Sequence, residues 1–257
     1  MDQVLEKKNR VFLGLDISTK TVGVTIASET DGDLKIMQVT HLRPKIPTKI
    51  KGIEALFMKS SIITEELNKY KSYGITNVVI EEPLVGSNNS ETVATLLRYN
   101  GMISQSVYNV LGVVPEFISS YDARKYACPH LMAVRKFNKK GEVYSLTKVR
   151  RSIKKNELVL FGQYPFDCAK KLILWNYVSE KYPYIEWQYD KNGELKDENF
   201  DASDSMICVL GYISKEKYCD TVPEIISVNE IKRQDGGVTV KYVTRFCDQT
   251  FEKNIDL

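Results

Sequence analysis

The sequence lacks an apolar run approaching the roughly 18 to 20 residues that a membrane-spanning helix needs, so we expect no transmembrane segment and no membrane partner. It also lacks the pattern of a cleavable leader, because the polar start MDQVLEKKNR runs directly into VFLGLDIS. These absences predict a cytoplasmic location, which would be the host cytoplasm if the chain is phage-encoded.

Cysteine is scarce and scattered. The five cysteines are never closer than eleven residues apart, which excludes a Cys-x-x-Cys zinc knuckle and predicts no disulfide framework. We therefore expect buried or unreactive thiols. The two histidines, His41 and His130, have no ligand or triad spacing. A Gly-x-Ser-x-Gly motif, a catalytic Cys/His arrangement and a Gly-rich phosphate loop are also absent, so covalent catalysis has no support.

Charge is nearly balanced, since 36 basic and 33 acidic residues give a formal charge of +3. With 27% charged and 43% hydrophobic residues, the composition is typical of a folded globular protein. The distribution is more informative than the sum. Between Arg135 and Lys155 there are nine Lys or Arg residues and a single acid, Glu142. One basic segment therefore accompanies an otherwise slightly acidic chain.

Hydrophobic periodicity predicts an α/β fold in the first half of the chain. Residues 11–41 predict three strands joined by tight turns, which form an antiparallel meander. Apolar residues from Ile50 to Tyr70 recur every three or four positions, which predicts an amphipathic helix before Gly74. The next elements are a strand at 77–82, a helix from Glu91 to Leu111 that Gly112 ends, and a strand at 113–118. This order predicts a mixed five-stranded sheet with helices on both faces.

The pattern changes after about residue 128. The expected segments are a basic insertion at 131–163, helices at 167–180 and 200–214, a polar loop between these helices, and a C-terminal β-hairpin that turns at 234–237. We therefore expect one domain at 1–214, which carries the basic insertion, and a C-terminal extension at 215–257.

Carboxylates interrupt two of the predicted strands. Asp16 lies in a hydrophobic strand, where an unpaired charge costs several kcal/mol to bury. Either a bound cation compensates it, or it caps the Ser18–Lys20 turn. Glu81 and Glu82 end the fourth strand, and one of them faces the same way as Asp16 because strand side chains alternate. A solvated strand end is the alternative interpretation.

Two further carboxylates belong to the last predicted helix. Asp201 and Asp204 are three residues apart, so they project from one face of that helix. Because they lie near a helix N-terminus, their role could instead be limited to a favourable interaction with the positive end of the helix dipole. Taken together with the strand carboxylates, three separate segments supply an all-oxygen site of the kind that holds Mg²⁺ or Mn²⁺. Bound cations would relieve the repulsion among the ionised groups.

The ordered motifs GLDISTKTVGVTI, VVIEEPL and FDASDSM resemble the RuvC family of Holliday junction resolvases, which have the RNase H-like fold. The resemblance covers about residues 10–127 and 165–214. It implies that the catalytic metal-binding carboxylates are Asp16, Glu81, Asp201 and Asp204. Glu81 is preferred to Glu82 because the family's glutamate directly follows the apolar run.

The implied chemistry is hydrolysis of a phosphodiester with two Mg²⁺ or Mn²⁺ ions about 3.5–4 Å apart. We assign Asp16 as the bridging ligand and Glu81 and Asp204 as flanking ligands. Asp201 is either a second ligand or the group that orients the nucleophilic water.

The resemblance also implies a catalytic basic residue at the start of the helix before the last. That residue would be Lys171, and Lys170 is the neighbouring candidate for DNA contact. Bacterial resolvases of this type place an aromatic wedge three residues beyond the glutamate, and Leu84 stands at that place here. The substrate would be branched DNA such as a four-way junction.

A four-way junction has approximate two-fold symmetry, so we expect paired nicks by a homodimer. The predicted helix from Glu91 to Leu111 would contribute to its interface. The insertion and the C-terminal extension exceed a compact bacterial resolvase, which suggests a phage or viral branch.

The basic insertion predicts phosphate binding, because Lys and Arg gain affinity by releasing counterions from nucleic acid. The candidate DNA-binding residues there are Lys148, Arg150, Arg151, Lys154 and Lys155. A solvated surface loop without function is the alternative. Phe137 and Tyr144 either stack on unpaired bases or pack locally.

Three alternative functions remain open at this point. One is another RNase H-like nuclease, which processes RNA or resembles a transposase. A second is a nucleotide-binding protein, because GLDISTKTVGV also resembles the first phosphate motif of actin-like ATPases and sugar kinases. A third is a non-catalytic DNA-binding protein, which would leave the four carboxylates unexplained.

Overall fold

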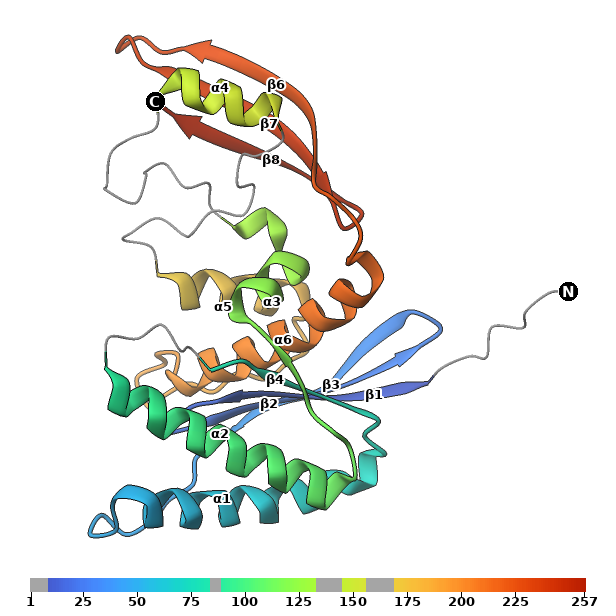
Figure 1. The fold of residues 1–257 in the computed structure, drawn as a ribbon, viewed down its shortest axis with the longest axis vertical. Coiled ribbons are helices and arrows are strands. Elements are labelled where there is room, and N and C mark those ends of the chain that lie inside the picture. Colours follow the sequence, from blue (N-terminus) through green and yellow to red (C-terminus); the bar gives the residue numbers. More distant parts are fainter. Residues whose placement is uncertain (1–8, 84–88, 133–144, 156–168) are drawn as a thin grey trace, which may run out of the picture.

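The computed structural model describes residues 9–83, 89–132, 145–155 and 169–257, and Figure 1 shows their arrangement. A five-stranded sheet forms the centre, with strand order β3-β2-β1-β4-β5. The strands are β1 (Arg10–Ile17), β2 (Val22–Thr30), β3 (Asp33–Leu42), β4 (Asn77–Glu81) and β5 (Glu116–Ile118). The first three strands are antiparallel, whereas β4 pairs in parallel with both β1 and β5.

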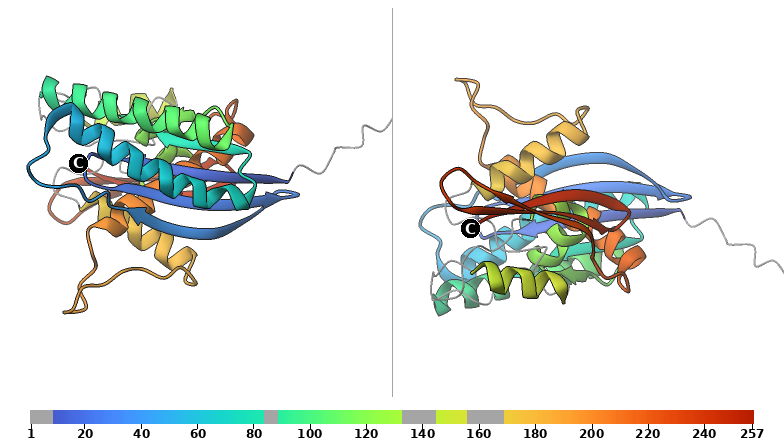
Figure 2. Two further views of the ribbon diagram at one scale, coloured as in Figure 1. Left: turned by 90° about the horizontal axis from the view of Figure 1, so that it is seen from below. Right: turned by 90° about the horizontal axis from the view of Figure 1, so that it is seen from above.

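Helices cover both faces of this sheet, as the sequence predicts (Figures 1 and 2). One face is covered by α1 (Gly52–Lys69) and α2 (Ser90–Leu111), and the other by α3 (Ser120–Ala127), α5 (Lys170–Lys181) and α6 (Glu198–Tyr218). Two short 3₁₀ turns, Tyr70–Tyr73 and Pro129–Leu131, follow α1 and α3. Asn89 caps α2 by accepting a hydrogen bond from the Thr92 amide, and Gly112 ends this helix in the left-handed conformation. We call these strands and helices the five-stranded unit.

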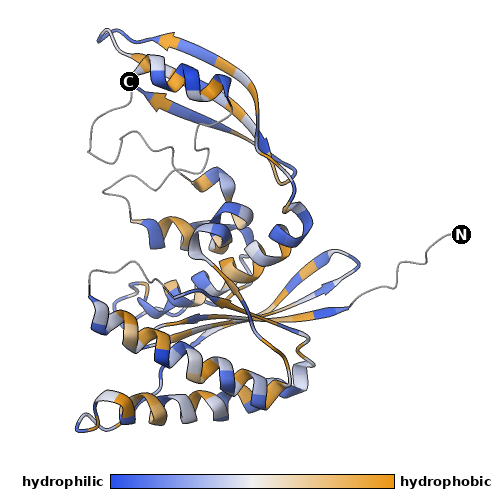
Figure 3. Ribbon diagram, viewed as in Figure 1, coloured by the Kyte–Doolittle hydropathy of each residue, from blue (hydrophilic) through white to orange (hydrophobic). Residues whose placement is uncertain are grey.

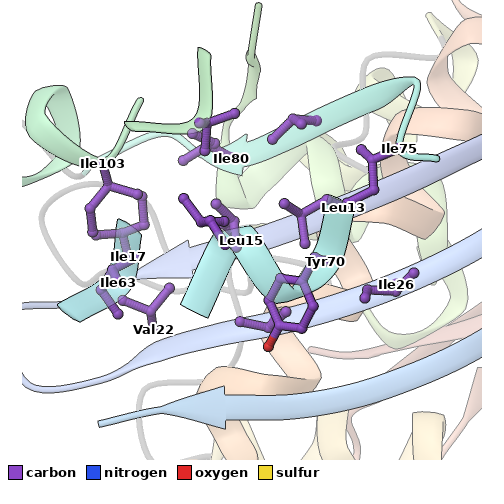
Figure 4. Packing of buried hydrophobic residues seen from close by; sticks show 14 of the residues in the cluster. Leu13, Leu15, Ile17, Val22, Ile26, Ile63, Tyr70, Ile75, Ile80 and Ile103 are labelled. Atoms are coloured by element: carbon purple, nitrogen blue, oxygen red, sulfur yellow. The ribbon is translucent and has the colours of Figure 1, made fainter. Parts of the chain in front are cut away.

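Successive side chains of the central strands point to opposite faces of the sheet, so the core has two layers. Leu13, Leu15 and Ile17 of β1 pack with α1 and α2, and Figure 4 shows them beside Ile80 and Ile103. The intervening residues face the opposite side, where Phe12 packs in the layer that contains α6. Because both faces are covered, the central strands are apolar almost throughout (Figure 3).

A second, three-stranded antiparallel sheet has the order β6-β7-β8. Its strands are β6 (Glu224–Lys232), β7 (Val238–Phe246) and β8 (Gln249–Asp256). Helix α4 (Leu146–Lys154) packs on it, so that Val149 is buried with Val240 and Tyr242. We call α4 with β6, β7 and β8 the three-stranded unit. Helix α4, which lies within the basic insertion, and the C-terminal strands thus share one core.

The structure differs from the sequence interpretation in four elements. Helices α3 and α4 were not expected, and β5 is three residues long rather than six. Strand β8 adds a third strand to the expected hairpin. The turn before β8 uses Cys247 and Asp248, which have φ values of 50° and 57°. Cysteine seldom adopts this left-handed conformation, so the sequence carries no glycine-type turn signal there.

Candidate active site

Alternation in two parallel neighbours directs two carboxylates to the same side of the sheet. On β4, Val78 and Ile80 pack with α1 and α2, whereas Val79 packs in the α6 layer. Glu81 therefore faces α6, and the same alternation on β1 makes Asp16 face α6. Both residues stand at the carboxyl ends of their strands, and Leu15 pairs with Ile80 immediately before them. Glu82, by contrast, is exposed.

Helix α6 brings the other two carboxylates because two glycines let its backbone touch the sheet. A Cβ atom on Gly23 would lie 1.9 Å from the Asp201 carbonyl oxygen, and one on Gly14 would lie 2.5 Å from the Ser205 carbonyl oxygen. Any larger side chain at either position would push the helix away. The first turns of α6 therefore lie directly over β1 and β2, and Asp204 is 6% exposed.

Hydroxyl groups fix this contact between helix and sheet. The Thr21 hydroxyl donates to the Asp201 carboxylate. The Thr25 and Ser205 hydroxyls are 2.8 Å apart and both are fully buried. The structure thus holds Asp201 at the rim of the cluster and Asp204 inside it. We call Asp16, Glu81, Asp201 and Asp204 the carboxylate cluster.

The carboxylate cluster brings together more negative charge than the surrounding groups and solvent stabilise. Removal from water and repulsion from Glu81, Asp204 and Asp201 hold the pKa of Asp16 well above its usual range. Removal from water and repulsion from Asp204 raise the pKa of Glu81 to about 7. Burial also raises the pKa of Asp204. These carboxyls therefore resist ionising together in the absence of additional positive charge.

Two cationic side chains contact the carboxylate cluster. Lys171 Nζ lies 3.2 Å from Asp201 Oδ1, and Arg124 Nη2 lies 3.7 Å from Asp204 Oδ1. Burial lowers the pKa of Lys171, but Asp201 and the other carboxylates outweigh it, so the net shift is upward. Lys171 was expected from the sequence to act here, and the structure places it beside Asp201.

Arg124 is a neighbour of the carboxylate cluster that the sequence interpretation missed. It belongs to α3, which begins two residues after β5 and is capped by the Ser119 hydroxyl. Arg124 is partly buried, and its Nε atom is buried without a hydrogen-bond partner among the described residues. Ser119 followed three residues later by Asp122 is a helix-start pattern that would have indicated α3.

Cys208 lies one helical turn beyond Asp204 and supports Glu81. Its Sγ atom is 3.8 Å from Glu81 Oε2 and the side chain is fully buried. Burial raises the pKa of this thiol, so it stays protonated and donates to the carboxylate. Cys208 is therefore a positioning residue for Glu81 rather than a nucleophile.

The donor set of the carboxylate cluster suits a hard divalent cation, because carboxylate oxygens are the ligands that Mg²⁺ and Mn²⁺ prefer. The buried excess of negative charge is the feature that such an ion would neutralise. As they stand, the described residues form no group of three or more His, Cys, Asp or Glu side chains close enough to ligate one ion together. Lys171 and Arg124 instead make the close contacts to Asp201 and Asp204.

The candidate DNA-binding residues are less uniform than the sequence suggests. Lys170, the first residue of α5, is exposed. On α4, Arg151 and Lys154 are exposed, whereas Arg150 Nε donates to Glu230 Oε1 of β6 over 2.5 Å. Lys148 and Lys155 also lie on α4 or directly after it, and both have interaction partners. Leu84, Phe137 and Tyr144 lie outside the described residues.

Strand order and direction define the class of fold. A meander of three antiparallel strands, continued by two strands parallel to the first, is the mixed sheet expected for an RNase H-like fold. The predicted fold class is therefore confirmed. Among the described residues, no helix is long and apolar enough to cross a bilayer.

Comparison with known proteins gives structural similarities only. No protein-family model matches the chain, and no curated protein matches it. RuvC from Thermus thermophilus in complex with a Holliday junction substrate is 11% identical, with a TM-score of 0.48 over 82% of this chain and 96% of that chain. A Ppx/GppA family member from Aquifex aeolicus is 17% identical, with a TM-score of 0.33 over 68% and 62%. The large terminase of bacteriophage D6E is 14% identical, with a TM-score of 0.29 over 80% and 40%. At these identities, activity does not transfer from the similar proteins to this chain.

Proposed function

We propose that this protein is a metal-dependent endonuclease that nicks branched DNA, with the four-way junction as its substrate. The observation that carries the proposal is the convergence of Asp16, Glu81, Asp201 and Asp204 on one side of the sheet, where the charges of the first, second and fourth are buried and incompletely neutralised. A protein that did not use this charge would gain stability by replacing it.

The four carboxylates would hold two Mg²⁺ or Mn²⁺ ions, with Asp16 between the ions and Glu81 and Asp204 flanking it. When bound, the ions supply positive charge that stabilises the attacking and leaving oxygens of the phosphodiester. Asp201 lies at the rim, within reach of Lys171, and either completes the ligand set or orients the attacking water.

The cationic residues of the chain have separate tasks in this proposal. Lys171 is 58% exposed in its side chain and can turn from Asp201 toward a phosphate oxygen of the substrate. Arg124 is less exposed and stays beside Asp204, where its charge partly offsets the rise that burial causes in the pKa of Asp204. The Cys208 thiol donates to the Glu81 carboxylate and thereby positions it.

We also propose that the catalytic domain spans 1–214 with its insertion at 131–163, and that 215–257 is an extension serving the insertion. The burial of Val149 of α4 against Val240 and Tyr242 supports this relation. Delivery of paired nicks calls for a dimer. The outward face of α2, where Leu97 and Tyr108 are 43% and 51% exposed, is the surface we propose for its interface.

The test is a cleavage assay with purified protein on a four-way junction, a flap, a linear duplex and an RNA–DNA hybrid, each with Mg²⁺ and with EDTA. We expect metal-dependent nicking of the junction, with 5′-phosphate ends. Cleavage of the hybrid alone would favour an RNA-processing nuclease and would contradict the proposal. An actin-like nucleotide-binding protein is disfavoured, because that fold needs a duplicated second half and the other sheet here has three antiparallel strands.

A further inference from the structure

A second basic segment lies at the catalytic edge of the sheet, in the loop between β3 and α1. From Leu34 to Ile53 the chain contains no Asp or Glu. Within this stretch, Arg43, Lys45, Lys49 and Lys51 fall on nine consecutive residues after the end of β3. We call residues 43–51 the lysine loop. Because the charged residues of this stretch are all basic, they create a local positive potential, whereas most protein surfaces intersperse charges of both signs.

The register of the sheet places the start of the lysine loop at the same edge of the sheet as the carboxylate cluster. Asp16 pairs with Gly23, and Gly23 pairs with His41. Because neighbouring strands are about 4.8 Å apart, the His41 backbone lies about 10 Å from that of Asp16. Lys45 follows four residues later, so the chain carries it at most about 14 Å further.

Contacts with α6 confirm that the end of β3 approaches the carboxylate cluster. Arg43 Nη1 donates to Glu198 Oε1 in the first turn of α6. Burial lowers the pKa of His41, and the nearby charges of Glu198 and Asp201 partly oppose this shift. One residue of the lysine loop is thus tied to the same helix turn that presents Asp201, and the remaining lysines extend from there.

The lysine loop contains a hydrogen-bonded turn, and its lysines are exposed. Pro44 is buried, and the Ile50 amide donates to the Pro47 carbonyl oxygen over 3.0 Å, which closes a turn around Lys49. Lys45, Lys49 and Lys51 are exposed and form no ion pair or side-chain hydrogen bond with the described residues. Exposed cations on a fixed backbone are available to an external anion at little entropic cost.

We propose that the lysine loop binds the phosphate backbone of a duplex arm that leads away from the cleaved phosphodiester. The proposal rests on the proposed nuclease function and adds a binding surface to it. In Figure 1 this loop precedes α1 on one side of the five-stranded sheet, and α4 lies on the opposite side. A branched substrate has more than one arm, so basic residues on both sides of the five-stranded sheet suit it. The recognition is electrostatic and independent of base sequence.

The first test measures binding in EDTA, so that cleavage plays no part. The variant Lys45→Gln/Lys49→Gln is compared with Lys35→Gln/Lys71→Gln, which removes the same charge. Lys35 lies near the start of β3 and Lys71 follows α1, so both control residues are exposed at the opposite end of the sheet. The probes are a four-way junction and a linear duplex.

We expect the lysine-loop variant to flatten the plot of log K against log salt by about 0.9 for each phosphate that the loop no longer neutralises. For each phosphate contact that is lost, the ratio of variant to wild-type Kd should then be roughly eightfold higher at 0.1 M salt than at 1 M salt. The control variant should keep the wild-type slope. Equal slopes for the two variants would overturn the proposal.

A second measurement locates the bound arm. Photocrosslinking from p-benzoylphenylalanine in place of Lys49 should attach the protein to a junction arm, whereas the same replacement of Lys71 should not. Absence of crosslinks from position 49 would also overturn the proposal. Cleavage by the wild type, assayed separately, tests the nuclease function. A wild type that cleaves while the variant keeps its salt slope therefore refutes the lysine loop alone, and a wild type that binds without cleaving refutes the nuclease.

Discussion

The five-stranded unit and the three-stranded unit differ in where they place charged residues. In the first, like charges converge in a buried layer, and the pKa of Glu81 rises to about 7 because solvation and counter-charge are insufficient. In the second, charges stand on the surface in opposite pairs, such as Arg150 with Glu230 and Lys241 with Glu252. Exposed pairs contribute little to stability and cost little to keep.

This difference distinguishes charged residues that the proposed reaction requires from charged residues that have little effect on folding. Buried repulsion lowers stability, so we expect it to persist only where the charge has a use. In the three-stranded unit, the half-buried Lys253 has its own acceptors, because its Nζ donates to the His130 carbonyl oxygen over 2.6 Å and also to that of Met132. That contact joins β8 to the turn after α3 and needs no external partner.

The largest effect is expected from Asp16→Asn. The change keeps the volume of the side chain but removes one ligand charge from the carboxylate cluster. The transition state would be less stable by about 4 kcal/mol, which corresponds to about a 10³-fold slower nicking rate. Junction binding in EDTA should remain. Wild-type turnover by this variant in Mg²⁺ would contradict the metal assignment.

A comparison of neighbouring glutamates tests the strand register. Glu81→Gln should slow cleavage by about 10²-fold or more, because Glu81 faces α6 and contacts Cys208. Glu82→Gln changes an exposed residue and should leave the rate within about twofold of the wild type. If the two variants ranked in reverse order, the active face of β4 would be wrongly assigned.

Alternation along the strands predicted only that one of Glu81 and Glu82 shares a face with Asp16, and the choice of Glu81 came from the family resemblance. In the structure, Val79 packs in the α6 layer, so Glu81 is the residue on that face. The mixed sheet with helices on both faces followed from hydrophobic periodicity, because predicted helices and apolar strands alternate up to residue 118.

The missed elements carry weaker signals. Helix α3 has only eight residues, too few for its periodicity to stand out, and only the pattern of Ser119 and Asp122 marks its start, so Arg124 was not connected with Asp204. Helix α4 is nine residues long, and its apolar face meets a sheet that is about a hundred residues away in sequence. The lysine loop has no secondary structure, and its relation to Asp16 follows only from the pairing of three strands.

The pH dependence of stability should separate the two units. In the unfolded chain, the pKa of Glu81 is about 4.3, whereas in the folded protein it is about 7. The folded state therefore holds the Glu81 proton up to a higher pH than the unfolded chain, so the contribution of Glu81 to stability is greatest below about pH 4 and declines as pH rises to about 7. We expect a decrease on the order of 3 kcal/mol in EDTA, measured by thermal melting. Glu81→Gln should remove most of this slope.

Lys253 should act in the opposite direction and at higher pH. Burial lowers its pKa to about 8, whereas the unfolded chain binds the proton up to about pH 10.4. Stability should therefore rise with pH between about 8 and 10.4, because the unfolded state binds more protons there. The slope difference between the wild type and Lys253→Met isolates this contribution. An identical slope in both proteins would contradict the lowered pKa of Lys253.

The packing of α4 on its sheet predicts a smaller change. Val149→Ala removes two methyl groups from a residue that is 1% exposed and should destabilise the three-stranded unit by about 2 kcal/mol. Ile226→Ala on β6, where the side chain is 44% exposed, serves as the control and should shift melting much less. Cleavage of saturating DNA should be unaffected by either change, since the carboxylate cluster lies in the other unit.

The smallest expected effect concerns the pair of Arg150 and Glu230, and it tests whether α4 binds phosphates. Both side chains are exposed, so Glu230→Gln should leave the melting temperature close to that of the wild type. The change frees the Arg150 guanidinium, which would then bind a phosphate without first giving up a carboxylate. We therefore expect tighter junction binding and a salt slope steeper by about 0.9, while Arg150→Gln should flatten the slope or leave it unchanged. If neither variant moves the slope but the lysine-loop variant does, DNA binds on the α1 side of the carboxylate cluster, and α4 serves only to cover the three-stranded sheet.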